Sequence, residues 1–191
     1  MKNIFKSAIF LIVAMLAGSS AAAGQSAAFT AIPFVDDELG VGGGNAKWSG
    51  NIGVADAVST TKYGLRFEKT APLEQLVAAG VVLKGLEGQA IFPGDTLGFD
   101  IKIDSPCRGG SPRFNVSYTV GERAGLAFLG CSEGITAATP DPLWQRVTLS
   151  LQLPEGAVIE SVVLMVDEPG RYVVDNIAFL DLVADTPEHA R

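Results

Sequence analysis

Residues 143–182 read LWQRVTLSLQLPEGAVIESVVLMVDEPGRYVVDNIAFLDL, and this stretch is the clearest indication of the fold class. From Val147 to Leu153 every second residue is apolar and those between are polar. A period of two is typical of a strand that turns one face to a core. Triplets with Pro and Gly then interrupt the pattern, as turns do. The stretch predicts three successive strands, over residues 144–153, 158–166 and 172–180.

The same pattern extends toward the N-terminus. Thr96–Asp104 (TLGFDIKID) alternates in the same way, and further strands are predicted over residues 64–68, 79–84, 114–120 and 126–129. Short strands separated by Gly- and Pro-rich turns indicate an all-β fold, an antiparallel β-sandwich (jelly roll) in a single domain. Ala71–Ala79 has helical character, so a short helix there is an open alternative. Residues 36–60 are Gly-rich and weakly periodic, which predicts a long loop layer.

The C-terminal pattern also carries a resemblance. A Trp-led strand, an apolar strand and a closing strand with Asp175-Asn176-Ile177 resemble the C-terminal half of galactose-binding-like jelly rolls, the fold of many carbohydrate-binding modules. The middle segment CRGGSPRFNV, residues 107–116, resembles a signature of uncharacterised secreted bacterial proteins. The first resemblance implies a sandwich and a glycan as partner.

The N-terminus reads as a bacterial-type signal peptide over residues 1–23. Lys2 and Lys6 precede an apolar run, Ile9–Leu16, and small residues end at Ala23. The run is about half the ~20 residues that a membrane span needs, so a buried N-terminal helix is the alternative rather than an anchor. We therefore expect a secreted or periplasmic protein that has no membrane partner after signal cleavage. Its predicted parts are a folded domain at residues 24–184 and a frayed tail at 185–191.

Charge and cysteine usage narrow the function classes. The chain has 14 Lys and Arg against 21 Asp and Glu, and losing Lys2 and Lys6 takes the net charge from −7 to −9. Without basic clusters, nucleic acid is excluded as a partner. Cys107 and Cys131 flank a predicted hairpin, and in an oxidising compartment such a pair indicates a disulfide. Two free thiols are the alternative.

The sequence presents no catalytic constellation. The only histidine is His189, in the predicted tail, which excludes Ser-His-Asp and Cys-His catalysis and histidine-ligated metals. A carboxylate-based hydrolase or lyase needs two facing acids. Asp100 and Asp104 lie on the same face of the predicted strand and are one candidate pair, and Asp167 with Glu168 is a second pair. The other interpretation of such acids is the solvated face of a strand.

Calcium is the inorganic ligand that the resemblance implies. In such modules a structural calcium uses an Asp of the closing strand, and Asp175 holds the matching position. Asp36, Asp37 and Glu38 would lie nearby if the first strand pairs with the last. The alternative for Asp175 is a hydrogen bond to backbone amides of a neighbouring loop.

A glycan site needs an exposed aromatic face and planar hydrogen-bonding groups. Trp48 in the predicted loop layer, with Tyr63 behind it, supplies the rings, whereas Trp144 is expected in the core. Arg113 and Asn115 alternate with core-type residues and would line a groove, the alternative being an ordinary solvated strand face. The leading hypothesis is a secreted, non-catalytic domain that binds a glycan or cell-surface polymer. The alternatives are a structural or adhesive protein that contacts other proteins and, third, the carboxylate enzyme.

Overall fold

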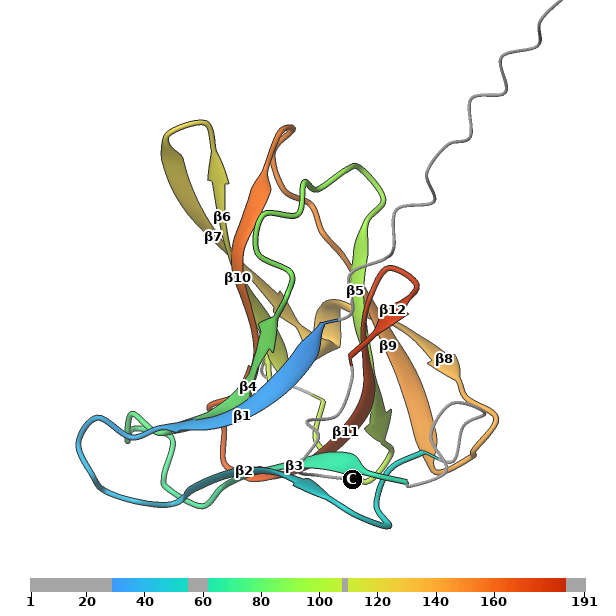
Figure 1. The fold of residues 1–191 in the computed structure, drawn as a ribbon. Coiled ribbons are helices and arrows are strands. Elements are labelled where there is room, and N and C mark those ends of the chain that lie inside the picture. The colour runs from blue at the N-terminus through green and yellow to red at the C-terminus, as the bar shows by residue number, and fades with distance from the viewer. Residues whose placement is uncertain (1–28, 55–61, 108–109, 185–191) are drawn as a thin grey trace, which may run out of the picture.

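The computed structural model describes residues 29–54, 62–107 and 110–184 and shows two antiparallel sheets around one apolar core (Figure 1). The antiparallel β-sandwich of jelly-roll type predicted from the sequence is confirmed. The predicted signal peptide, the tail and His189 lie outside the described residues. In the ranges that are described, no helix has the length and apolar character needed to cross a membrane.

One sheet has five strands in the order β1-β4-β10-β6-β7. The other has seven, in the order β2-β3-β11-β5-β9-β8, with β12 paired to β11. The five-stranded sheet consists of β1 (Thr30–Asp36), β4 (Ala78–Lys84), β6 (Arg113–Val120), β7 (Arg123–Gly130) and β10 (Val158–Val166). The seven-stranded sheet consists of β2 (Gly44–Ser49), β3 (Gly64–Lys69), β5 (Thr96–Lys102), β8 (Ile135–Ala138), β9 (Trp144–Ser150), β11 (Gly170–Phe179) and β12 (Leu182–Val183).

Period-two alternation builds the core from both sheets. On β5, Leu97, Phe99 and Ile101 are fully buried, as the alternation predicts. Phe114 of β6 is fully buried opposite them, and the centroids of the Phe99 and Phe114 rings are 5.7 Å apart. The two sheets therefore pack against each other through every second side chain of their strands. The alternate side chains point away from the core and form the two outer faces of the sandwich.

Edge strands account for the elements that the sequence did not predict. The expected loop layer at 36–60 is wrong over Gly44–Ser49, because β2 pairs with β3 there. β2 is a sheet edge and needs few apolar residues, so its alternation is faint. β1 is the edge of the other sheet and contains Pro33, a residue that edge strands tolerate and central strands do not.

The segment before β4 is not helical. The N–H of Gln75 donates to the carbonyl of Pro72 in a single turn, and β4 begins at Ala78. Ala78 and Ala79 pair with β1, and Gly80 packs against the backbone of β10, where a Cβ would lie 2.4 Å from the Leu164 carbonyl oxygen. Pairing on both sides holds the small residues in a strand despite their helical character.

The disulfide between Cys107 and Cys131 is confirmed, with Cα atoms 5.4 Å apart. Cys131 directly follows β7 and opens a short 3₁₀ helix, η1 (Cys131–Glu133), and Cys107 lies on the segment that leads into β6. The bridge thus joins the two open ends of the β6–β7 hairpin. In the chain-entropy account, closing such a loop stabilises the fold by roughly 3–4 kcal/mol.

Candidate binding site

The solvent side of β6 carries polar residues in a row. Arg113 and Asn115 alternate with Phe114 and Val116, which are fully buried, so the first two face outward on the five-stranded sheet. On β10, Met165 lies opposite Arg113 and Val163 opposite Asn115. Arg113 and Asn115 therefore share one face, and their role as ligand residues stays a prediction.

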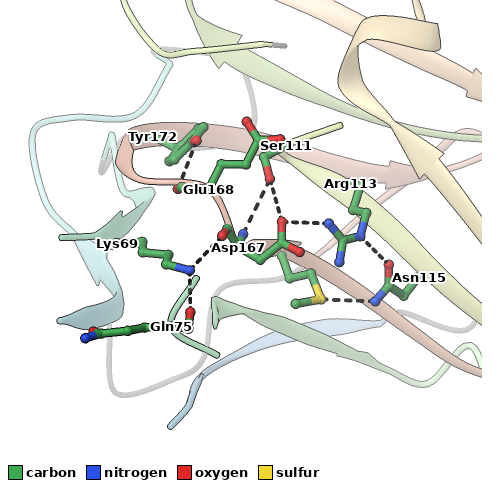
Figure 2. A network of polar contacts seen from close by, with 9 residues as sticks. Lys69, Gln75, Ser111, Arg113, Asn115, Asp167, Glu168 and Tyr172 are labelled. Atoms are coloured by element: carbon green, nitrogen blue, oxygen red, sulfur yellow. Dashed lines mark hydrogen bonds and ion pairs between the residues drawn. The ribbon is translucent and has the colours of Figure 1, made fainter. Parts of the chain in front are cut away.

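Arg113 is held in place by its neighbours (Figure 2). Its Nη1 donates to Oδ1 of Asp167 at 2.6 Å, and its Nε donates to Oδ1 of Asn115 at 3.0 Å. The Ser111 hydroxyl donates to the same Asp167 oxygen at 3.0 Å. The side chains of Arg113 and Asp167 are 21% and 36% exposed, so the pair lies at the surface but is partly shielded. The guanidinium therefore has a fixed plane before any ligand arrives.

The Asp167 carboxyl is kept ionised by this arrangement. Burial acts to raise the pKa of Asp167, but the hydrogen bond and charge of Arg113, helped by Ser111, outweigh it and lower the pKa. A carboxyl with a lowered pKa is poorly suited to donate a proton, so Asp167 does not fit the acid role in a hydrolytic pair with Glu168. Asp167 instead positions Arg113.

An exposed ring lies beside this network. Phe128 of β7 is directly opposite Asn115 and is 57% exposed. The guanidinium carbon of Arg113 is 5.8 Å from the centroid of its ring. Phe128 was not among the predicted site residues, because the register between β6 and β7 determines which β7 residue faces Asn115. The sequence feature that could have identified Phe128 is its place in the alternating pattern of β7, which puts it on the outer face.

The space next to Arg113 is hollow because glycines surround it. Gly130 lies opposite Arg113 in the register, and the Cα of Gly110 is 3.1 Å from where a Cβ on Gly130 would be. The resulting cleft has a volume of about 360 Å³, at the lower end of the range for small-ligand sites. We call it the Arg113 cleft; its lining residues are Gly110, Arg113, Phe128, Gly130 and Glu133.

The two aromatic residues predicted for the site lie elsewhere. Trp48 is on β2, packs against the core, and donates its indole N–H to the carbonyl of Ala31 at 3.0 Å. Tyr63 directly precedes β3 and is half-buried beside Gly50. Trp48 is part of the seven-stranded sheet and Tyr63 leads into it, so the structure does not bring them together with Arg113 and Asn115, which are on the other sheet. Trp144 is buried, as expected.

Asp175 on β11 accepts hydrogen bonds from backbone amides, one of them in the segment that follows β2. Its Oδ2 accepts the N–H of Val54 at 2.7 Å, and its Oδ1 accepts the N–H of Asn176 at 2.8 Å. This is the backbone role that the sequence left open as the alternative to calcium. β1 pairs with β4 and not with β11, so the pairing that would have brought Asp36–Glu38 to Asp175 is absent. Among the described residues, no group of three or more His, Cys, Asp or Glu could hold a metal.

The predicted carboxylate pair on β5 does not form. β5 ends at Lys102, and Asp104 lies in the exposed turn that follows it. Asp100 is 6% exposed and accepts hydrogen bonds from Arg146 and Asn176 at 3.3 and 2.8 Å. The predicted strand over Thr96–Asp104 is wrong at its C-terminal end, because the chain turns after Lys102.

Comparisons with known proteins give similarity in structure only. No family model matches the chain, and no curated protein matches it. It is similar to a solved structure of the family 11 carbohydrate-binding module of the cellulosomal cellulase Lic26A-Cel5E of Clostridium thermocellum. The identity is 17%, over 84% of this chain and 91% of that chain, with a TM-score of 0.44. A second structure, a family 11 carbohydrate-binding module from Clostridium thermocellum in complex with a β-1,3-1,4-mixed-linked tetrasaccharide, is 18% identical over 84% of this chain and 99% of that chain, with a TM-score of 0.39.

Proposed function

We propose that this protein is a non-catalytic glycan-binding domain and that the Arg113 cleft holds the sugar. One observation carries the proposal: an exposed aromatic ring, Phe128, lies beside planar polar groups that are already fixed in orientation. Sugar rings have apolar C–H faces that stack on aromatic rings, and their edges carry hydroxyls that need donors and acceptors.

The cleft offers both a hydrogen-bond donor and a hydrogen-bond acceptor to a sugar hydroxyl. Nη2 of Arg113 has no hydrogen-bond partner within the described residues, although Nε and Nη1 are occupied. Glu133, which also lines the cleft, supplies acceptor oxygens. Because Asp167 fixes Arg113 in advance, less side-chain freedom is lost when a ligand binds.

The charge of the chain favours a neutral glycan. The net charge is −7 for the whole chain and −9 without the predicted signal. Long-range repulsion would slow the approach of an anionic polysaccharide, most strongly at low ionic strength. Export to the periplasm or the medium, the compartments where disulfides persist and extracellular polymers are met, is part of the same proposal.

Affinity electrophoresis of the exported protein in gels that contain single neutral polysaccharides, mixed-linkage β-1,3-1,4-glucan among them, tests the proposal. We expect at least one polysaccharide to retard the protein and Phe128→Ala to weaken this binding at least tenfold. The matched control is Phe92→Ala, because Phe92 is 65% exposed and does not line the cleft. If no polysaccharide retards the protein, or if Phe128→Ala binds as the parent does, the proposal fails and the adhesive alternative gains.

A further inference from the structure

A second cleft lies on the outer face of the other sheet. Its volume is about 640 Å³, and its floor consists of Asp100, Arg146 and Asn176 from three neighbouring strands, β5, β9 and β11. Asp100 lies directly opposite Arg146 in the register. We call this second cleft the Arg146 cleft. Its other lining residues are Val54, Ala138, Thr139, Pro140, Asp141, Ala178, Leu180, Asp181 and Val183.

The floor is rigid because its three polar groups bind one another. Nη1 of Arg146 donates to the carbonyl of Asn176 at 2.7 Å and to Oδ1 of Asp100 at 3.3 Å. The amide of Asn176 donates to the other Asp100 oxygen at 2.8 Å. The remaining N–H groups of Arg146 have no hydrogen-bond partner in the described part of the chain.

Two backbone features make room for this floor. The register of β11 against β5 shifts between Asp175 and Ala178, and Asn176 has a φ of 44° within that bulge. Bulges and left-handed non-glycine residues concentrate at sites where a side chain is re-aimed. Gly98 lies beneath the guanidinium, where a Cβ would be 3.0 Å from Nη2 of Arg146.

The chemistry of the walls decides what the cleft accepts. Arg146 is paired with Asp100, and Asp141 and Asp181 also line the cleft, so an anion would meet repulsion. Carboxylate acceptors and Arg146 donors together suit groups that donate and accept at once, as hydroxyls do. Leu180 and Pro140 provide an apolar side, and no aromatic ring is among the described lining residues.

We infer that the Arg146 cleft binds a small neutral polyhydroxylated ligand, either a free monosaccharide or the end of a glycan chain. This site is independent of the Arg113 cleft, which lies on the five-stranded sheet. The protein would then have two sugar sites, one on each of the two sheets drawn in Figure 1.

The test is an NMR titration of the ¹⁵N-labelled exported protein with a panel of neutral monosaccharides and, separately, their reduced and unreduced oligosaccharides. We expect saturable shifts for the amides of Gly98, Arg146 and Asp181. Ala138→Trp should fill the cleft and lower the affinity at least tenfold. Thr136→Trp is the matched control, because both residues are exposed on β8 and only Ala138 lines the cleft.

The outcomes separate the two sites and the two ligand sources. Shifts caused by monosaccharides identify a free sugar, and shifts caused only by oligosaccharides identify a chain end. Phe128→Ala should leave these shifts unchanged even if it abolishes polysaccharide binding. If no saccharide shifts these amides, or if Ala138→Trp binds as Thr136→Trp does, the inference is overturned whatever the fate of the Arg113 cleft.

Discussion

Replacing Asp167 with Asn should lower stability by an amount that depends on pH. The substitution keeps the shape of the side chain but removes the charge that accepts from Arg113 at 2.6 Å and from Ser111 at 3.0 Å. Hydrogen bonds to a charged group contribute about 1.5–3 kcal/mol each when shielded. Because the Asp167 side chain is 36% exposed, solvent screening reduces the total, and we expect a loss of roughly 1–2 kcal/mol near neutral pH.

The sign of the pH dependence follows from the lowered pKa of Asp167. A carboxyl whose pKa is lower in the folded state stabilises the fold above its ordinary pKa, near 3.8, and this contribution is lost as pH falls through the folded-state pKa. Urea unfolding of parent and Asp167→Asn at a series of pH values from neutral to strongly acidic measures the difference directly. The difference should hold steady near neutral pH and shrink only below about pH 4. A difference that is absent at neutral pH, or that stays constant into acid, would refute this account of Arg113.

Four further outcomes are expected. Replacing both Cys107 and Cys131 with Ser should lower the free energy of unfolding by roughly 3–4 kcal/mol in urea titrations, and a parent mass that does not rise by two daltons on reduction would contradict the disulfide. Phe99→Ala should cost about 3–5 kcal/mol in the same assay, because it removes a fully buried ring that contacts Phe114. Asp175→Asn should destabilise the protein by about 1–3 kcal/mol through the amide of Val54. The parent should melt at the same temperature with and without EDTA, and a lower melting temperature in EDTA would restore the calcium role of Asp175.

Strands with a strong period of two were predictable, whereas the edge strands β2 and β8 were not; β7, an edge strand of the other sheet, was predicted only in part, at residues 126–129. Thr96–Lys102 and Trp144–Ser150 alternate clearly because each packs against a neighbour on both sides and buries one whole face. β2 and β8 each have one neighbour, and β8 is exposed at all four residues. A strand that buries so little has no need of apolar residues, so its sequence reads as a loop.

The candidate site was half predictable for a related reason. Alternation on one strand is enough to place Arg113 and Asn115 on a common face. The approach of Phe128 and Asp167 depends on how β7 and β10 are registered against β6, across 54 residues in the case of Asp167. Local sequence does not show which residues of distant strands pair, so it pointed to Trp48, an aromatic residue in a weakly periodic segment, and not to Phe128.

The two clefts share a design in which the core sets the geometry of the surface. Phe114 and Val116 fix the strand that presents Arg113, and Leu97, Phe99 and Ile101 fix the strand that presents Asp100. Because Phe99 and Phe114 contact each other across the sandwich, loosening one disturbs the backbone beneath both clefts. A substitution of a residue on the outer face of one sheet should therefore affect the cleft on that sheet and leave the other cleft intact. Loss of binding at both clefts together would point to the core rather than to either site.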